Sequence, residues 1–115
     1  MTEVLLVCGR DGCFERCKAT GHASFAAKGY DIVCAAESVL LRTAVDVLQN
    51  TGGLDVQSDS SVRGAFGFSV RVTGGSSADF ALAERLRCVA DFIRSGIKGL
   101  ESEFPENVHL QEIIE

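Results

Sequence analysis

The sequence contains no long apolar run, no tryptophan and a single proline. A membrane-spanning helix needs about 18 or more consecutive apolar residues, so no contact with a membrane is expected. The N-terminus, MTEVLLVCGR, has a glutamate at position 3 and an apolar run of five residues. That run is too short and its flank too acidic for a secretory signal. We therefore expect a cytoplasmic protein, in which thiols stay reduced.

Basic residues are also scarce. The 11 lysines and arginines stand against 16 aspartates and glutamates, which gives a formal net charge of −5. The basic residues are scattered, so direct binding of nucleic acid is not expected. A chain of 115 residues, 46% of them hydrophobic and without repeats, is long enough for one core. The sequence therefore predicts a single domain over residues 1–115.

The five cysteines are an odd number and lack the spacing of a small disulfide-rich scaffold. Most of them, including Cys88, are therefore expected to be structural residues, as small buried hydrophobes commonly are. Cys8, Cys13, Cys17 and His22 form the pattern C-x4-C-x3-C-x4-H, which lacks the close cysteine pair of a zinc site. No metal and no other cofactor is expected.

Hydrophobic periodicity predicts five strands and two helices in the order ββαββαβ. The strands are expected over residues 3–8, 13–20, 54–58, 62–72 and 108–113, with a turn at 9–12 and a loop at 21–30. Two helices against one mixed, mostly antiparallel sheet make an α+β domain. In the simplest packing both helices share one face of that sheet.

The first helix is expected to follow Asp31, whose carboxylate can cap the backbone N–H groups two or three residues on. Apolar residues then recur at spacings of three and four. They are Val33, Ala36, Leu40, Ala44 and Leu48. Glu37 lies off this stripe and is expected to face solvent.

The second helix is expected to begin near Ser76, with Asp79 in a weak capping-box pattern. Its apolar face continues for about five turns. The residues of that face are Ala83, Leu86, Ala90, Ile93, Ile97 and Leu100. Residues beyond Pro105 can then form the last strand.

Cys34 is the cysteine best suited to chemistry, because a cap at Asp31 would put it in the first turn of the helix. Unpaired N–H groups and the positive end of the helix dipole stabilise a thiolate there, and could also hold an oxyanion. His22, twelve positions earlier, could serve as its base if the intervening loop folds back. Gly21 and Gly29 would let the backbone bend and lie close to a bound peptide. A cysteine that only packs is the alternative.

The stretch GHASFAAKGYDIVCAAESVL, residues 21–40, resembles the signature of the ribosomal-processing cysteine protease family, Prp. That signature is G-H-A, a variable loop, and then G-x-D-[IV]-V-C-A-[AG]-x-S. The matching residues are Gly21, His22, Ala23, Gly29, Asp31, Ile32, Val33, Cys34, Ala35, Ala36 and Ser38. Residues 96–105 also resemble the second helix of the family and its exit, so the resemblance covers most of the chain.

The resemblance implies a Prp-like cysteine protease with a His22–Cys34 dyad, and a homodimer. The implied substrate is the N-terminal extension of the precursor of large-subunit ribosomal protein twenty-seven. The loop of residues 21–31 would order over that substrate. Gly21, Gly29, Asp31 and Ser38 would contact it.

Several alternatives stay open from the sequence. Asp31 could instead be a helix cap or orient His22, and Ser38 could bond to a carbonyl of its own helix. Glu37 departs from the family pattern, in which that position is usually apolar, and it could tune the choice of substrate instead of facing solvent. The other functions considered are a non-catalytic ribosome-associated binding domain on the same scaffold and a thiol acyltransferase or thioesterase. Nothing in the sequence indicates the acyl-carrier site that such an enzyme needs.

Overall fold

The structure is a computed structural model that describes residues 1–21, 28–62 and 64–115, with residues 28–31 described by their backbone. The elements along the chain are β1 (Thr2–Cys8), β2 (Phe14–Thr20), α1 (Lys28–Gln49), β3 (Leu54–Asp59), β4 (Ala65–Val72), the 3-10 turn η1 (Thr73–Gly75), α2 (Phe80–Glu103) and β5 (Val108–Ile114). The predicted order ββαββαβ is therefore confirmed. In the described part of the chain, neither helix is both long and apolar enough to cross a membrane.

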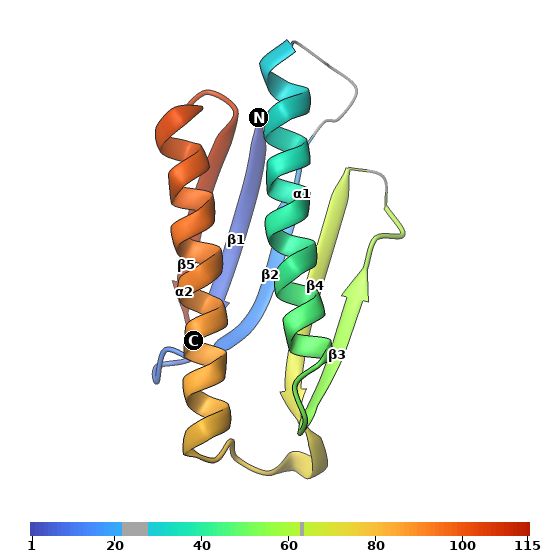
Figure 1. Ribbon diagram of the computed structural model, residues 1–115, viewed down its shortest axis with the longest axis vertical. Helices are drawn as coiled ribbons and strands as arrows, with labels where there is room; N and C mark the ends of the chain where they lie inside the picture. The colour runs from blue at the N-terminus through green and yellow to red at the C-terminus, as the bar shows by residue number, and fades with distance from the viewer. Residues whose placement is uncertain (22–27, 63) are drawn as a thin grey trace.

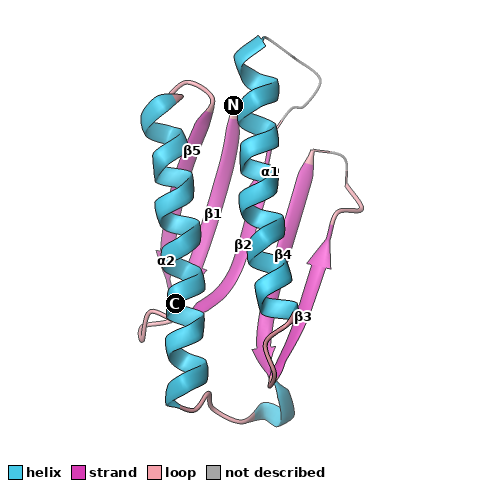
Figure 2. Cartoon of the chain, in the orientation of Figure 1, coloured by secondary structure: helices cyan, strands magenta, loops and turns pink. Residues whose placement is uncertain are grey.

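The five strands form one sheet in the order β3-β4-β2-β1-β5. Neighbouring strands are antiparallel except for β1 and β5, which run parallel. Both helices lie side by side across one face of this sheet (Figures 1 and 2). The predicted α+β class, with two helices on a mixed and mostly antiparallel sheet, is confirmed.

The strand register explains why the helix-facing side of the sheet is apolar. Val4 pairs with Ala19 on β2 and with Leu110 on β5, and Leu6 pairs with Cys17. Because side chains alternate between the two faces of a strand, paired residues point to the same side of the sheet. All five are buried and belong to the core under the helices.

The second helix follows its predicted apolar stripe but begins four residues after Ser76. Its N-cap is Asp79, whose side chain accepts a hydrogen bond from the Leu82 backbone N–H at 2.8 Å. Ser76 is extended backbone and caps the preceding turn η1. The capping-box prediction therefore misplaced the cap, because serine and aspartate are both good N-cap residues.

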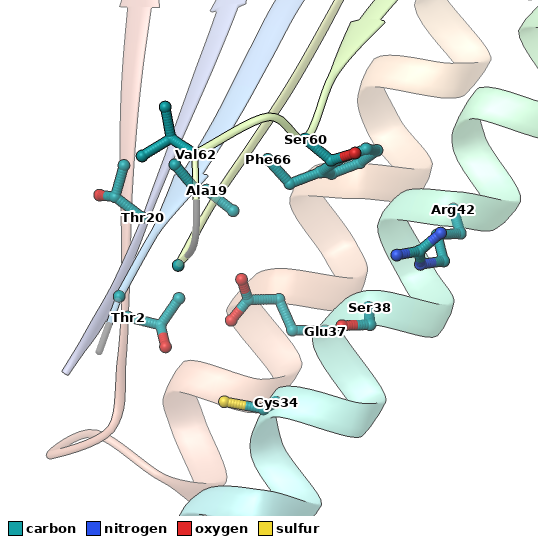
Figure 3. A pocket seen from close by; sticks show the side chains of 13 residues that line it. Thr2, Ala19, Thr20, Cys34, Glu37, Ser38, Arg42, Ser60, Val62 and Phe66 are labelled. Carbon is teal, nitrogen blue, oxygen red and sulfur yellow. The ribbon is translucent and has the colours of Figure 1, made fainter. Parts of the chain in front are cut away.

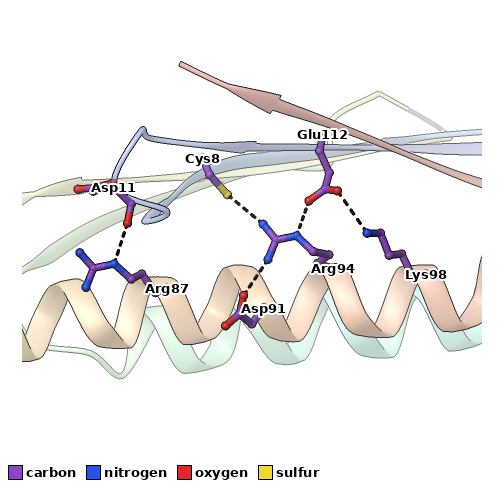
Figure 4. Close-up of polar contacts among 7 residues, drawn as sticks. All are labelled: Cys8, Asp11, Arg87, Asp91, Arg94, Lys98 and Glu112. Carbon is purple, nitrogen blue, oxygen red and sulfur yellow. Dashed lines mark hydrogen bonds and ion pairs between the residues drawn. The ribbon is translucent and has the colours of Figure 1, made fainter.

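Polar contacts hold α2 against the sheet (Figure 4). Arg94 donates to the carboxylate of Glu112 on β5, and the Lys98 ammonium lies 3.6 Å from the same carboxylate. Near the other end of the helix, Arg87 donates to the Asp11 backbone oxygen at 2.7 Å. These contacts fix α2 over the strands β1 and β5.

The first helix begins at Lys28, so Asp31 is its fourth residue and not its N-cap. The predicted cap was wrong, and the predicted loop ends before Lys28 because Gly29 is also helical. A carboxylate is favourable both as a cap and inside the first helical turn, where it meets the positive end of the dipole. The identity of Asp31 was therefore compatible with either helix start.

The buried face of α1 also differs from its prediction. The residues buried on it are Val33, Glu37, Leu41, Ala44, Val45 and Leu48. Ala36 and Leu40, which were expected in the stripe, are only half-buried. Glu37 lies four residues after Val33 and four before Leu41, so one helical face carries all three. The prediction that Glu37 faces solvent was therefore wrong, since its side chain is 6% exposed.

Candidate active site

A hollow of about 260 Å³ opens between the first half of α1 and the ends of the neighbouring strands. Its lining residues are Thr2, Ala19, Thr20, Gly21, Cys34, Glu37, Ser38, Arg42, Ser60, Val62, Gly64, Ala65 and Phe66. We call it the Cys34 hollow. Figure 3 shows α1 forming one wall and the strands with the β3–β4 connection forming the other.

Cys34, Glu37 and Ser38 form the helical wall of the Cys34 hollow. Residues three and four apart lie on the same side of a helix, about 5–6 Å between their Cβ atoms. Figure 3 shows the Cys34 sulfur and the Glu37 carboxyl group pointing from α1 toward the strands. Cys34 is half-buried and Ser38 is exposed, so both side chains are within reach of a molecule in the hollow.

The position of Cys34 in α1 corrects the expected source of thiolate and oxyanion stabilisation. Cys34 is the seventh residue of a helix that begins at Lys28, so it lies in the second turn. Only the first four N–H groups of a helix lack an intrahelical partner. The backbone N–H of Cys34 is therefore inside the helix, and the expected oxyanion hole at a first-turn cysteine was wrong.

Glu37 is the buried charged residue of the hollow. Its Oε2 has no hydrogen-bond partner among the described residues. Burial raises the pKa of this carboxyl from its ordinary 4.5 to about 7. Arg42 also lines the hollow, but its guanidinium carbon lies 5.6 Å from the centroid of the Phe66 ring, in a cation–π arrangement. No ion pair joins Arg42 to Glu37 in the described part of the structure.

Two glycines form the strand wall where β2 ends and β4 is about to begin. The Gly21 backbone N–H donates to the Gly64 oxygen at 2.9 Å. Gly64 has a φ of +80°, and a Cβ there would lie 2.5 Å from the Gly21 oxygen. Glycine at position 64 therefore permits both the backbone conformation and the close approach that shape this wall.

Three other cysteines are buried in the core and do not line the Cys34 hollow. Burial raises the pKa of Cys8, raises that of Cys13 to about 11 and raises that of Cys17 to about 12. These thiols therefore stay protonated near neutral pH, as their predicted packing role requires. Cys88 is exposed on α2 and does not line the Cys34 hollow, so the prediction of a buried residue fails there.

The structure brings together three of the residues predicted for the site. Gly21, Cys34 and Ser38 all line the Cys34 hollow. Gly29 and Asp31 lie in the first turn of α1, before Cys34 along the helix. Residues 31 and 34 are three positions apart, so their Cα atoms lie on the same side of the helix.

The predicted partner of Cys34 is His22, which lies outside the described residues. The preceding residue, Gly21, lines the Cys34 hollow. No group of three or more histidine, cysteine, aspartate or glutamate side chains that could hold a metal ion occurs in the described ranges.

The sequence analysis missed the strand wall and the burial of Glu37. The spacing of four from Val33 to Glu37 and on to Leu41 was the signal for that burial, but the glutamate was assumed to be exposed. Ser60 lies in a polar connection, and Gly64 lies within the segment 62–72 that the pattern predicted as a strand. Nothing local in these residues indicates that they face Cys34.

Comparison with known proteins gives matches over almost the whole chain. The family model described as cysteine protease Prp matches residues 1–109. No curated protein sequence matches the chain.

Among solved structures, SMU.848 from Streptococcus mutans is similar with a TM-score of 0.75 and 25% identity, covering 100% of this chain and 96% of its own. The ribosomal processing protease Prp from Staphylococcus aureus in complex with a substrate peptide is similar with a TM-score of 0.76 and 19% identity. The same protease with a covalently linked product peptide has a TM-score of 0.71 and 23% identity. Each of these two comparisons covers 98% of this chain and 100% of the other. At these identities the two Staphylococcus structures support the fold.

Proposed function

Since the chain belongs to the cysteine protease Prp family, we propose that it removes the N-terminal extension of large-subunit ribosomal protein twenty-seven with a Cys34–His22 dyad. The observation that carries this proposal is the place of Cys34. Its half-buried thiol opens into a hollow that Gly21 and Ser38 also line. Residues from both ends of the family signature, on either side of its variable loop, therefore line the same hollow.

In the proposed reaction the Cys34 thiolate attacks the carbonyl carbon of the scissile peptide bond. The tetrahedral intermediate collapses to a thioester, and the C–N bond breaks as His22 protonates the departing amine. His22 then accepts a proton from water, which attacks the thioester and releases the new carboxyl end with the Cys34 thiol restored. Hydroxyl donors in the Cys34 hollow, such as Ser38, can stabilise the oxyanion.

The proposed peptide contacts follow the same signature. Gly21 and Ser38 lie in the hollow, and Gly29 and Asp31 lie just before Cys34 on α1. A Staphylococcus aureus relative of the same fold has been solved with a substrate peptide, which supports a peptide as ligand. We extend the proposal to a cytoplasmic homodimer that needs no metal or other cofactor and does not bind nucleic acid directly.

The direct test is to incubate the extended ribosomal protein from the same organism with the wild type and with Cys34→Ala and His22→Ala variants. We expect the wild type to remove the extension and each variant to lose at least about a thousandfold in kcat/KM, as for other nucleophile–base pairs. Cys88→Ala, which removes an exposed thiol outside the hollow, should retain full activity.

Mass spectrometry of the products identifies the cleaved bond. The protease assignment is wrong if the wild type leaves the extension intact or if Cys34→Ala still trims it. Tight binding of the extended protein without cleavage would favour the non-catalytic binding domain.

A further inference from the structure

The proposed dyad does not use Glu37, although this residue lies beside Cys34. Glu37 lies on the face of α1 that packs against the sheet. The other buried residues of that face are apolar, and the Glu37 side chain is 6% exposed. Its Oε2 lacks a hydrogen-bond partner in the described ranges, and the residue lines the Cys34 hollow. An apolar side chain would fill the same position without the desolvation that a buried carboxyl suffers. Buried carboxyls with a strongly perturbed pKa cluster at ligand-binding and catalytic sites.

In the described part of the chain, the surroundings of Glu37 lack a positive complement. Cys34 on the same helix and Cys17 on β2 add only negative charge if they ionise. Arg42 is directed over the Phe66 ring. From β1 the side chain lining the hollow is Thr2, which does not titrate. A cation that neutralises this carboxylate must therefore come from outside the described residues.

The hollow has the size and the lining to admit such a group. Its volume of about 260 Å³ is several times the roughly 30 Å³ that one water molecule occupies in the liquid, which leaves room for one long side chain. The hydroxyls of Thr20 and Ser60 also line it and can accept hydrogen bonds from an ammonium or guanidinium group. The net charge of −5 favours the approach of a basic peptide.

We propose that Glu37 is a specificity-determining residue whose carboxylate binds a lysine or arginine side chain of the peptide substrate, close to the bond that Cys34 attacks. The proposal rests on the proposed protease function. A charge-assisted hydrogen bond in a partly desolvated site is stronger than a neutral one. An uncharged side chain in the same place would leave the buried carboxylate without a partner, and an acidic side chain would be repelled.

The test uses peptides that span the cleavage junction, with each of the positions on either side of the bond set in turn to lysine or to norleucine, its uncharged isostere. We compare kcat/KM for the wild type, Glu37→Gln and Asp46→Asn. Asp46 is exposed on the same helix and outside the hollow, so its variant controls for the loss of one negative charge. At one position the wild type and Asp46→Asn should prefer lysine about 10- to 100-fold, and Glu37→Gln should lose this preference.

Binding separates this proposal from the protease function. Fluorescence anisotropy of the same labelled peptides is measured with Cys34→Ala and with Cys34→Ala/Glu37→Gln. If no peptide is cleaved but lysine still improves binding through Glu37, the protease function fails and the specificity stands. Equal lysine-to-norleucine ratios with and without Glu37, in both cleavage and binding, overturn the specificity.

A pH series on the wild type tests the same point without a variant at position 37. The pKa of Glu37 is raised to about 7 by burial, so the lysine-to-norleucine ratio in kcat/KM should increase from about pH 5.5 to about pH 8.5 as the carboxyl ionises. A ratio that stays constant over this range contradicts the proposal.

Discussion

At the scale of single residues, the site contains the Cys34 thiol and the Glu37 carboxyl, and burial has different consequences for these two groups. Cys34 has a small side chain, so its position is compatible with a packing role or with a catalytic role. Glu37 is not compatible with simple packing, because a buried carboxyl without a partner lowers stability when it ionises. Its burial among apolar side chains therefore points to function more strongly than its residue type does.

Glu37→Leu should stabilise the protein at alkaline pH. Burial raises the pKa of the folded-state carboxyl from 4.5 to about 7, so the folded state retains a proton that the unfolded state has released. The free energy of unfolding of the wild type should therefore fall as pH rises from about 4.5 to about 7. The full penalty above that range is on the order of 3 kcal/mol, and Glu37→Leu should remove it.

Urea unfolding at pH 4.5 and pH 8 measures the effect. The variant and the wild type should differ most at pH 8, and the difference should shrink toward pH 4.5. A difference that is the same at both values of pH would show that the Glu37 carboxyl does not titrate in this range in the folded state.

At the scale of the elements, the hollow depends on where α1, β2 and β4 begin and end. The hydrogen bond from Gly21 to Gly64 joins the end of β2 to the residue before β4. The sequence pattern predicted β4 from residue 62, but the strand begins at Ala65, after Gly64 in its left-handed conformation. Ser60, Val62 and Gly64 therefore lie outside the ladder and line the Cys34 hollow.

Gly64→Ala should destabilise this corner of the sheet. The left-handed conformation costs an alanine about 1–2 kcal/mol, and the contact between its Cβ and the Gly21 oxygen, 2.5 Å in the present geometry, forces the backbone to shift. That shift should add about 1–3 kcal/mol. Gly75→Ala is the matched control, because Gly75 has a φ of +69° but no atom within 4 Å of its Cβ position.

Thermal and urea unfolding of both variants give the comparison. Gly64→Ala should lose more stability than Gly75→Ala, and it alone should reduce cleavage of the peptide substrate. Equal losses of stability in the two variants would mean that the backbone shifts at little cost to relieve the contact between the alanine Cβ and the Gly21 oxygen.

At the scale of the whole molecule, both helices cover one face of the sheet (Figure 1). The Cys34 hollow lies beside the first half of α1. Strands β1, β2 and β4 and the β3–β4 connection line the hollow, and β3 and β5 pair with β4 and β1. The negative net charge of the chain acts over the entire surface and favours basic partners.

The proposed homodimer is a property at this scale. Multi-angle light scattering should give twice the mass of the chain, and dilution should leave the dimer intact if its interface is of the size typical of stable assemblies. A single-chain mass at the concentrations used for activity would rule out a dimer as the active form.

Much of this arrangement followed from local patterns. The period of two in the strands and the stripe from Leu86 to Ile97 depend only on neighbouring residues, so the element order and the α+β class were predictable. The signature around Cys34 indicated the protease family, and the family model confirmed it. The start of α1 was not predictable, because Asp31 is favourable in either of two positions there.

The sequence by itself determined the order of the elements and the family, and it indicated Cys34 among five cysteines as the candidate nucleophile. Only the tertiary structure decided that Glu37 is buried without a described partner, and that Gly64 approaches Gly21 at the strand wall. The physical reason is that burial and backbone approach depend on contacts between segments far apart in the chain. Periodicity predicts which residues share a face of a helix or strand, but it does not predict which residues pack against that face.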